Sequence, residues 1–176
     1  DVLGSRGLGD VYKRQDMNMD EIMEYQGRLY FMPRKEIKRK TEELLDFCGL
    51  LPFRKRTVRK LSGGMKRKLM VCRALLTSPE ILLLDEPTAG MDALSRRQMW
   101  NLLRQLNGKN LTILLTTHYM EEAQSLCNRV ALMDHGKLVA TGKHQELIQS
   151  CPEYQKLWKA AQDSAEWKVH TAKEGK

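Results

Sequence analysis

Residues 81–87 limit the fold of this chain more than any other stretch. They read ILLLDEP, so four apolar residues are followed at once by Asp85, Glu86 and Pro87. An apolar run of this length is typical of a strand buried on both faces of a parallel sheet, and proline ends such a strand. In open α/β sheets, ligands bind outside the carboxyl ends of the strands. We therefore expect a buried strand that delivers two adjacent carboxylates to a ligand site.

Two further motifs flank this strand. Upstream, Ser62, Gly63 and Gly64 open a basic helical pattern, where serine can cap the helix and the glycines let a phosphate approach the backbone N–H groups. Downstream, the apolar segment 111–117 predicts a second buried strand, and His118 follows it. Each motif alone is commonplace, because SGG occurs in linkers and a strand-end carboxylate or histidine is often only solvated. Their succession indicates an ATP-handling site.

Taken in order, these motifs resemble the nucleotide-binding domain of an ABC transporter ATPase. LSGGM (residues 61–65) resembles the family signature, residues 81–87 the Walker B strand, residues 89–92 the D-loop, and His118 the switch histidine. The resemblance covers roughly residues 22–142. Within it, the segments GGMKRKLM and LTTHYMEEAQSLC are most like the bacterial multidrug and export branch, whose membrane subunit is a separate chain. The C-terminal EYQKLWKAAQDSAEWKV instead looks like the tail of exporters that carry their own membrane domain.

The resemblance implies a fold, two ligands and a partner. The fold is α/β, the C-terminal part of a P-loop NTPase (RecA-like) ABC ATPase domain with a helical signature subdomain. The ligands are ATP and Mg²⁺. In the family two such domains dimerise head to tail around two ATP molecules and drive a transmembrane permease, which implies a cytoplasmic protein that lies peripherally on the inner face of the cell membrane. The transported substrate is left open, and so is the choice between a homodimer and a heterodimer.

The resemblance also assigns roles to individual side chains. Residues of the signature contact the γ-phosphate that the partner domain binds, Asp85 holds Mg²⁺ through a water, and Glu86 is the general base. His118 contacts the γ-phosphate as charge builds up, and Asp92 links the two sites across the interface. The implied set is Ser62, Gly63 and Gly64 for the nucleotide in trans, Glu86 and His118 for catalysis, Asp92 for the D-loop, and Asp85 for the metal.

One family motif is missing from these 176 residues. The Walker A loop, GxxxxGK(S/T), cradles the β- and γ-phosphates, but none of the Gly-Lys pairs here is followed by serine or threonine. Residues 1–15 are glycine-rich, lack any strand or helix period, and resemble a translated sequencing adapter, so we expect a foreign or disordered tail. The Walker A and Q-loop are then expected upstream of an N-terminally truncated piece, with Gln15 as a weak candidate for the Q-loop glutamine.

The apolar periodicity predicts the remaining elements. We assign residues 16–60 to a helical subdomain, 61–142 to the ATPase core and 143–176 to a C-terminal helical extension. Helices are expected over 20–31, 35–48, 65–77, 94–107, 120–127, 144–150 and 152–161, a basic loop over 51–60, and a hairpin over 130–141. Without further strands, we expect two parallel strands and a hairpin.

Composition narrows the possible partners. The net charge of +8 is local, because residues 34–73 hold 14 Lys or Arg against 4 Asp or Glu, yet few aromatic side chains interleave with them for base stacking. Nucleic acid is therefore an unlikely partner. The four cysteines have no CxxC spacing and indicate reduced thiols. Two alternatives stay open beside an export ATPase: a non-transport ABC ATPase acting in translation or DNA repair, and a piece that is inactive by itself.

Overall fold

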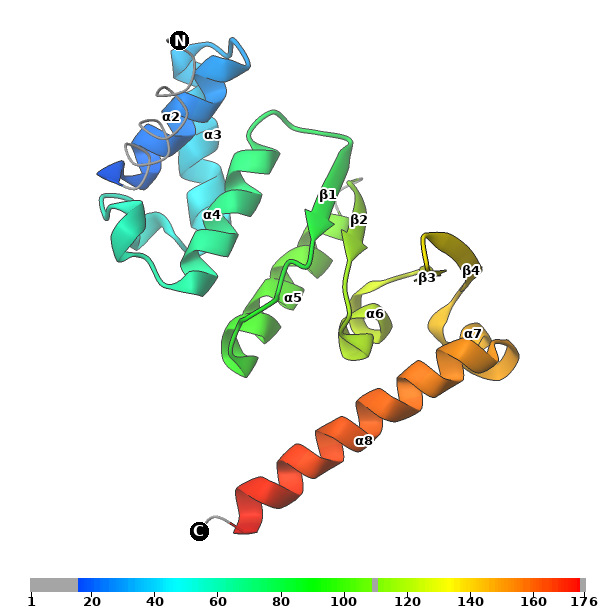
Figure 1. Cartoon of the computed structure of the whole chain (residues 1–176). Helices are drawn as coiled ribbons and strands as arrows, with labels where there is room; N and C mark the ends of the chain where they lie inside the picture. Colours follow the sequence, from blue (N-terminus) through cyan, green and yellow to red (C-terminus); the bar gives the residue numbers. More distant parts are fainter. Residues whose placement is uncertain (1–15, 109–110, 175–176) are drawn as a thin grey trace, which may run out of the picture. The chain divides into compact units, whose positions relative to one another are not determined.

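The computed structural model describes residues 16–108 and 111–174 of the chain. The chain divides into two units, Asp1–Leu115 and Thr116–Lys176, and each is described here by itself. The described part of the first unit contains helices α2 to α5, two short 3₁₀ turns, strand β1 and all but the last residue of β2. The described part of the second contains the β3–β4 hairpin and helices α6 to α8 (Figure 1).

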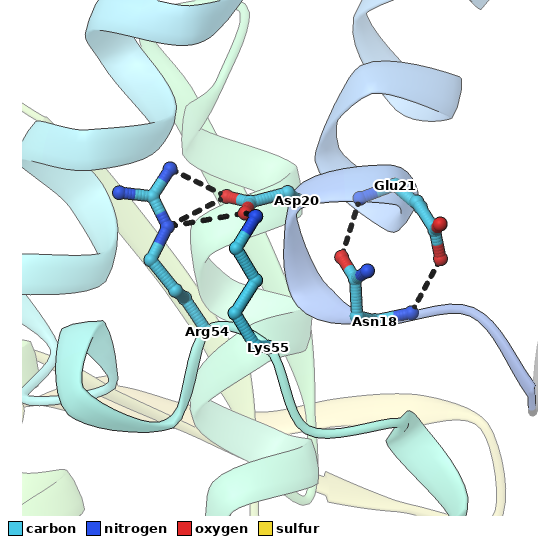
Figure 2. A network of polar contacts seen from close by, with 5 residues as sticks. All are labelled: Asn18, Asp20, Glu21, Arg54 and Lys55. Atoms are coloured by element: carbon cyan, nitrogen blue, oxygen red, sulfur yellow. Dashed lines mark hydrogen bonds and ion pairs between the residues drawn. The ribbon is translucent and has the colours of Figure 1, made fainter.

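A helical hairpin opens the described part of the first unit. Helix α2 (Met19–Leu29) begins at Asn18, whose side chain accepts a hydrogen bond from the Glu21 N–H at 3.1 Å, while the Glu21 carboxylate accepts the Asn18 N–H at 2.8 Å. This reciprocal capping box stabilises the first turn (Figure 2). Helix α3 (Arg34–Phe47) follows after Pro33 and ends before Gly49, whose φ of 67° is the left-handed conformation that stops a helix.

The predicted basic loop contains two 3₁₀ turns, η1 (Leu51–Phe53) and η2 (Val58–Lys60). It is tied back to the start of α2 by two backbone hydrogen bonds, in which Met19 N donates to Arg54 O and Val58 N donates to Met17 O. Helix α4 (Gly63–Leu75) then packs against both α2 and α3, and it buries Leu69, Val71, Cys72 and Leu75.

The rest of the first unit is a strand–helix–strand crossover. Strand β1 (Ile81–Asp85) leads into α5 (Ala93–Asn107), which buries Met99, Leu102, Leu103 and Leu106, and the chain returns through β2 (Thr112–Thr116). The two strands form one hydrogen-bonded sheet, and their arrows point the same way in Figure 1, as a helical crossover requires. The predicted helix face of α5 and the two predicted strands are thereby confirmed.

The second unit is built around the hairpin of β3 (Val130–Asp134) and β4 (Lys137–Gly142), which pair antiparallel. Its turn residues His135 and Gly136 both have positive φ, as two-residue hairpins prefer. Helices α6 (Met120–Leu126), α7 (His144–Ser150) and α8 (Pro152–Glu174) accompany it. A small core of Leu147, Cys151 and Tyr154 joins α7 and α8, with Val130, Leu132 and Ala140 of the hairpin packed against it.

Three expectations need correction. Neither β1 nor β2 is buried on both faces, because the two-stranded sheet of the described unit leaves one face open: Leu82 is 3% exposed, but Leu83 is 69% and Leu114 63% exposed. Helix α4 begins at Gly63, two residues before the predicted start. Helix α8 continues to Glu174 rather than ending near residue 161. The predicted boundaries at 15, 60 and 142 stay predictions.

No helix among the described residues is long and apolar enough to cross a membrane.

Candidate functional site

The LSGGM motif forms the start of helix α4. Ser62 is its N-cap, with extended backbone, and its Oγ accepts a hydrogen bond from the Met65 N–H at 3.2 Å. Gly63 and Gly64 occupy the first turn, where backbone N–H groups have no partner within the helix. Ser62 and Gly63 are exposed. The N–H groups and the dipole of α4 therefore point at a position where an anion would be stabilised.

Asp85 and Glu86 stand at the carboxyl end of β1, as predicted. Asp85 is the last strand residue and is exposed, whereas Glu86 is half-buried and has a φ of +42°. This left-handed backbone is uncommon for a residue with a side chain and is found preferentially at functional sites. A turn follows directly after the two adjacent carboxylates. Periodicity alone gives no signal for this feature.

A compact turn follows the carboxylates. Ala89 N donates to Glu86 O, Met91 N donates to Thr88 O, and Gly90 supplies a φ of +72°. The turn ends at Asp92, which caps α5 by accepting the Ser95 N–H at 2.9 Å. Hydrogen bonds from Ser95 hold the pKa of the Asp92 carboxyl below its usual value, so this side chain stays charged beside the positive end of α5.

The structure brings the start of α4 and the start of α5 together. A Cβ atom placed on Gly64 would lie 3.2 Å from Ser95 Oγ and 3.4 Å from Ser95 Cβ, so glycine allows a close approach there. One turn further along, Lys68 Nζ donates to Gln98 Oε1 at 3.2 Å. Ser62 to Gly64 and Asp92 thus belong to two helix N-termini that meet within the first unit.

The donors at the end of β1 can be compared with the needs of Mg²⁺. Among the residues that the structure describes, no group of three or more Asp, Glu, His or Cys side chains is placed to enclose a metal ion. Mg²⁺ in nucleotide sites uses only one or two carboxylates and takes its other oxygens from phosphates and waters. The exposed carboxylate of Asp85 therefore fits such an ion bound together with a nucleotide.

His118 belongs to the second unit. It follows Thr116, the last residue of β2, and its ring lies against the ring of Tyr119 with centroids 4.1 Å apart. Its position after the second strand agrees with the sequence prediction. The predicted approach of His118 to Glu86 spans the two units, so it stays a prediction.

Sequence reasoning missed a polar network in the helical hairpin. Asp20 accepts hydrogen bonds from Arg54 Nη2 at 2.7 Å and from Arg54 Nε, which reaches both carboxylate oxygens at 3.0 and 3.1 Å. It also accepts one from Lys55 Nζ at 2.8 Å (Figure 2). Partial burial raises the pKa of Asp20, but the bonds from Arg54 and Lys55 outweigh this and leave it below its usual value. A separation of 34 residues gives the sequence no signal for this pairing. The network lies at a cavity of about 330 Å³ between α2, α3 and the loop.

A comparison with protein-family models matches residues 6–89 to the family described as ABC transporter. The match begins inside residues 1–15. That segment lies outside the described residues, so its predicted foreign origin stays a prediction.

Curated relatives agree with this family. The chain is 42% identical over 133 residues to the Nod factor export ATP-binding protein I of Ralstonia nicotianae, covering 76% of the chain and 41% of that protein. It is 41% identical to the daunorubicin resistance ATP-binding protein DrrA3 of Streptomyces coeruleorubidus, covering 76% and 42%. It is 37% identical to the linearmycin resistance ATP-binding protein LnrL of Bacillus subtilis, covering 72% and 41%. The chain thus spans less than half the length of these relatives.

A solved structure agrees in fold. The ADP conformation of an ATP-binding cassette of an ABC transporter superposes with a TM-score of 0.71 at 22% identity, covering 84% of this chain and 64% of that one.

Proposed function

Because this chain belongs to the ABC transporter family and carries part of its ATP-binding cassette, we propose that the whole protein hydrolyses ATP to drive export through a separate membrane subunit. The observation that carries the proposal is the strand β1, which delivers Asp85 and Glu86 directly to a turn closed by the Asp92 cap. The export ATP-binding proteins among the relatives support transport over a role in translation or DNA repair.

The start of α4 contacts nucleotide in this proposal. Ser62 Oγ accepts from Met65 N, which leaves the hydroxyl proton of Ser62 to donate to a phosphate oxygen. The N–H groups of Gly63 and Gly64 add to this contact, because no side chain at either residue stands between the helix end and the ligand. The phosphate belongs to a nucleotide that a second ATP-binding domain holds, so the active form is a head-to-tail dimer.

The two carboxylates at the end of β1 have different roles in the proposed reaction. Asp85 holds Mg²⁺, through a water, and the ion would neutralise charge on the phosphates. Glu86 orients the attacking water and accepts its proton. The proton acceptor is typically worth about 10²–10⁴ in rate. His118 contacts the γ-phosphate, and Asp92, charged and fixed at the α5 cap, ties the two sites across the dimer interface.

The membrane subunit places the whole protein on the inner face of the cell membrane, with the ATP-binding domain in the cytoplasm. We expect no nucleic-acid partner, because few aromatic side chains interleave with the basic residues of 34–73. The relatives are named for different exported compounds or resistances, so no single substrate is assigned to this chain. Drug, lipid, polysaccharide and ion all remain open.

Glu86→Gln in the whole protein tests the assignment. The glutamine keeps the size and polarity of the side chain but cannot accept a proton, so ATP turnover should fall by about 10² or more while ATP binding persists. Glu80→Gln is the matched control, because Glu80 is exposed and precedes the same strand. Unchanged turnover in Glu86→Gln would remove Glu86 from the catalytic role.

A further inference from the structure

The turn between α2 and α3 presents an apolar tip. Leu29 is 56% exposed, Tyr30 59% and Phe31 95%. Figure 1 shows that the turn joins two helices lying side by side, and α2 and α3 pack against each other. Three consecutive large apolar side chains exposed at one turn form a patch that is open to a partner.

The backbone of this tip is fixed in an unfavourable conformation. Phe31 has a φ of +55°, in the left-handed region that bulky residues seldom adopt. Two hydrogen bonds hold the turn, from Phe31 N to Arg28 O and from Met32 N to Gly27 O, each 3.0 Å. Packing of the phenylalanine ring does not compensate for the strain, because the residue is almost fully exposed. These two bonds form a Schellman motif, so the left-handed φ of Phe31 ends α2 and fixes the turn that carries the exposed side chains.

Cations surround the apolar tip. Arg28 and Arg34 stand on either side of it and both contact Glu24, at 2.6 Å and 3.0 Å, so one carboxylate faces two guanidinium groups. Lys35 is exposed in the first turn of α3, and Lys38 is exposed one turn later. An excess of positive charge therefore lies beside Tyr30 and Phe31.

We propose that this tip binds the surface of a bilayer that contains anionic phospholipids, with Tyr30 and Phe31 inserted at the headgroup level. Aromatic rings are favoured at the membrane–water interface, and Lys or Arg near an anionic surface contributes attraction that salt screens. The proposal goes beyond ATP hydrolysis, because it concerns contact with lipid in the absence of nucleotide. It can therefore fail or hold independently of the proposed function.

The chemistry of the tip favours lipid over a protein partner. Leu29, Tyr30 and Phe31 follow one another along the chain at one protruding turn, which suits insertion into a soft surface rather than the periodic face that a helix presents to a groove. The positive charge beside the tip is complementary to acidic headgroups.

The test is cosedimentation of the full 176-residue chain with lipid vesicles. We expect binding to vesicles of phosphatidylcholine mixed with phosphatidylglycerol, weak binding to phosphatidylcholine alone, and loss of binding as salt is raised. Phe31→Gly should weaken partitioning about tenfold or more, because it removes an inserted ring. The same change suits a φ of +55°, so the melting temperature should not fall and misfolding cannot explain the loss.

Leu138→Ser is the matched control, because Leu138 is 59% exposed but lies on β4 in the other unit. It should bind vesicles like the unchanged chain. Equal binding of Phe31→Gly, or equal binding to neutral and anionic vesicles, would overturn the proposal. The proposal would also be overturned if the chain did not bind vesicles but bound the isolated membrane subunit in detergent in a way that depends on Phe31. The tip would then be a protein contact.

Discussion

Gly64 of α4 and Ser95 of α5 approach so closely that a Cβ atom on Gly64 would lie 3.2 Å from Ser95 Oγ. The contact joins the two helix N-termini that carry Ser62 and Asp92 as caps. The second glycine of the LSGGM motif thus has a packing reason within this chain, in addition to the phosphate contact proposed for it. The first glycine has no such reason, because a Cβ atom on Gly63 would meet nothing within 4 Å.

Alanine substitutions at Gly63 and Gly64 should have different effects on the stability of the chain. Gly63→Ala should be neutral or should stabilise the chain by up to about 1 kcal/mol, because alanine is the better helix former. Gly64→Ala should raise the free energy of unfolding less than Gly63→Ala does, or lower it, because the new methyl group crowds Ser95. Ser95→Ala should remove this crowding, so urea unfolding of the single and double variants should show a coupling energy of about 0.5 kcal/mol or more. Strict additivity of Gly64→Ala and Ser95→Ala would show that the approach of the two helices has no energetic consequence.

ATP should not stabilise the 176-residue chain. Ligand stabilisation requires a site in the native state, and these residues contain no GxxxxGK(S/T) loop. We expect the melting temperature to be the same with MgATP as with Mg²⁺ alone. A saturable rise of several degrees would contradict this and would show that the residues present hold nucleotide by themselves.

Asp20→Asn should destabilise the helical hairpin by about 1–2 kcal/mol near neutral pH, because it removes the charged acceptor of the hydrogen bonds from Arg54 and Lys55. The folded pKa of Asp20 lies below its usual 3.8, so its contribution is complete above pH 3.8 and disappears as the pH falls through the folded value. Urea unfolding against pH measures both effects. The control is Asp16→Asn, because Asp16 is 72% exposed and stands 3.8 Å from Arg59; an equal loss there would contradict the argument.

His144 should make the second unit sensitive to mild acid. Its Nδ1 lies 2.8 Å from the Tyr154 hydroxyl, its ring packs edge-on against Trp158, and desolvation lowers its pKa below the usual 6.5. The neutral form is favoured in the folded state, so stability is complete above pH 6.5 and is lost as the pH falls toward the folded pKa.

Substitution of His144 by Gln should flatten this pH dependence in thermal unfolding. His135→Asn should leave it unchanged, because the His135 side chain is 92% exposed and asparagine tolerates its φ of +45°. If His135→Asn flattened the profile and His144→Gln did not, the assignment to the buried ring would be wrong.

Local rules predicted most of the elements correctly. Ser62 caps α4, Gly49 ends α3, and the spacing of Met99, Leu102, Leu103 and Leu106 marks the buried face of α5. Each of these depends on neighbours within about two turns of the chain. The order of the motifs around Asp85 and Glu86 then identified the family.

The features that sequence reasoning missed depend on contacts between distant residues. Asp20 contacts Arg54, which is 34 positions away in the sequence. Gly64 in α4 approaches Ser95 in α5, although strand β1 lies between them in the sequence. The apolar run of β1 predicted two covered faces, but the cover of a sheet depends on how many layers are present rather than on the strand itself. The left-handed backbone of Glu86 has no local signal, since a turn after a strand usually places glycine there.

The open face of the β1–β2 sheet favours self-association of the purified chain during storage. Ile81, Leu83 and Leu114 are each at least 60% exposed, and among the described residues β1 and β2 form a sheet of two strands. Such strands offer unpaired backbone groups and an apolar surface to a second molecule. Storage at high concentration should therefore produce oligomers that grow with time. Leu83→Lys should slow this self-association.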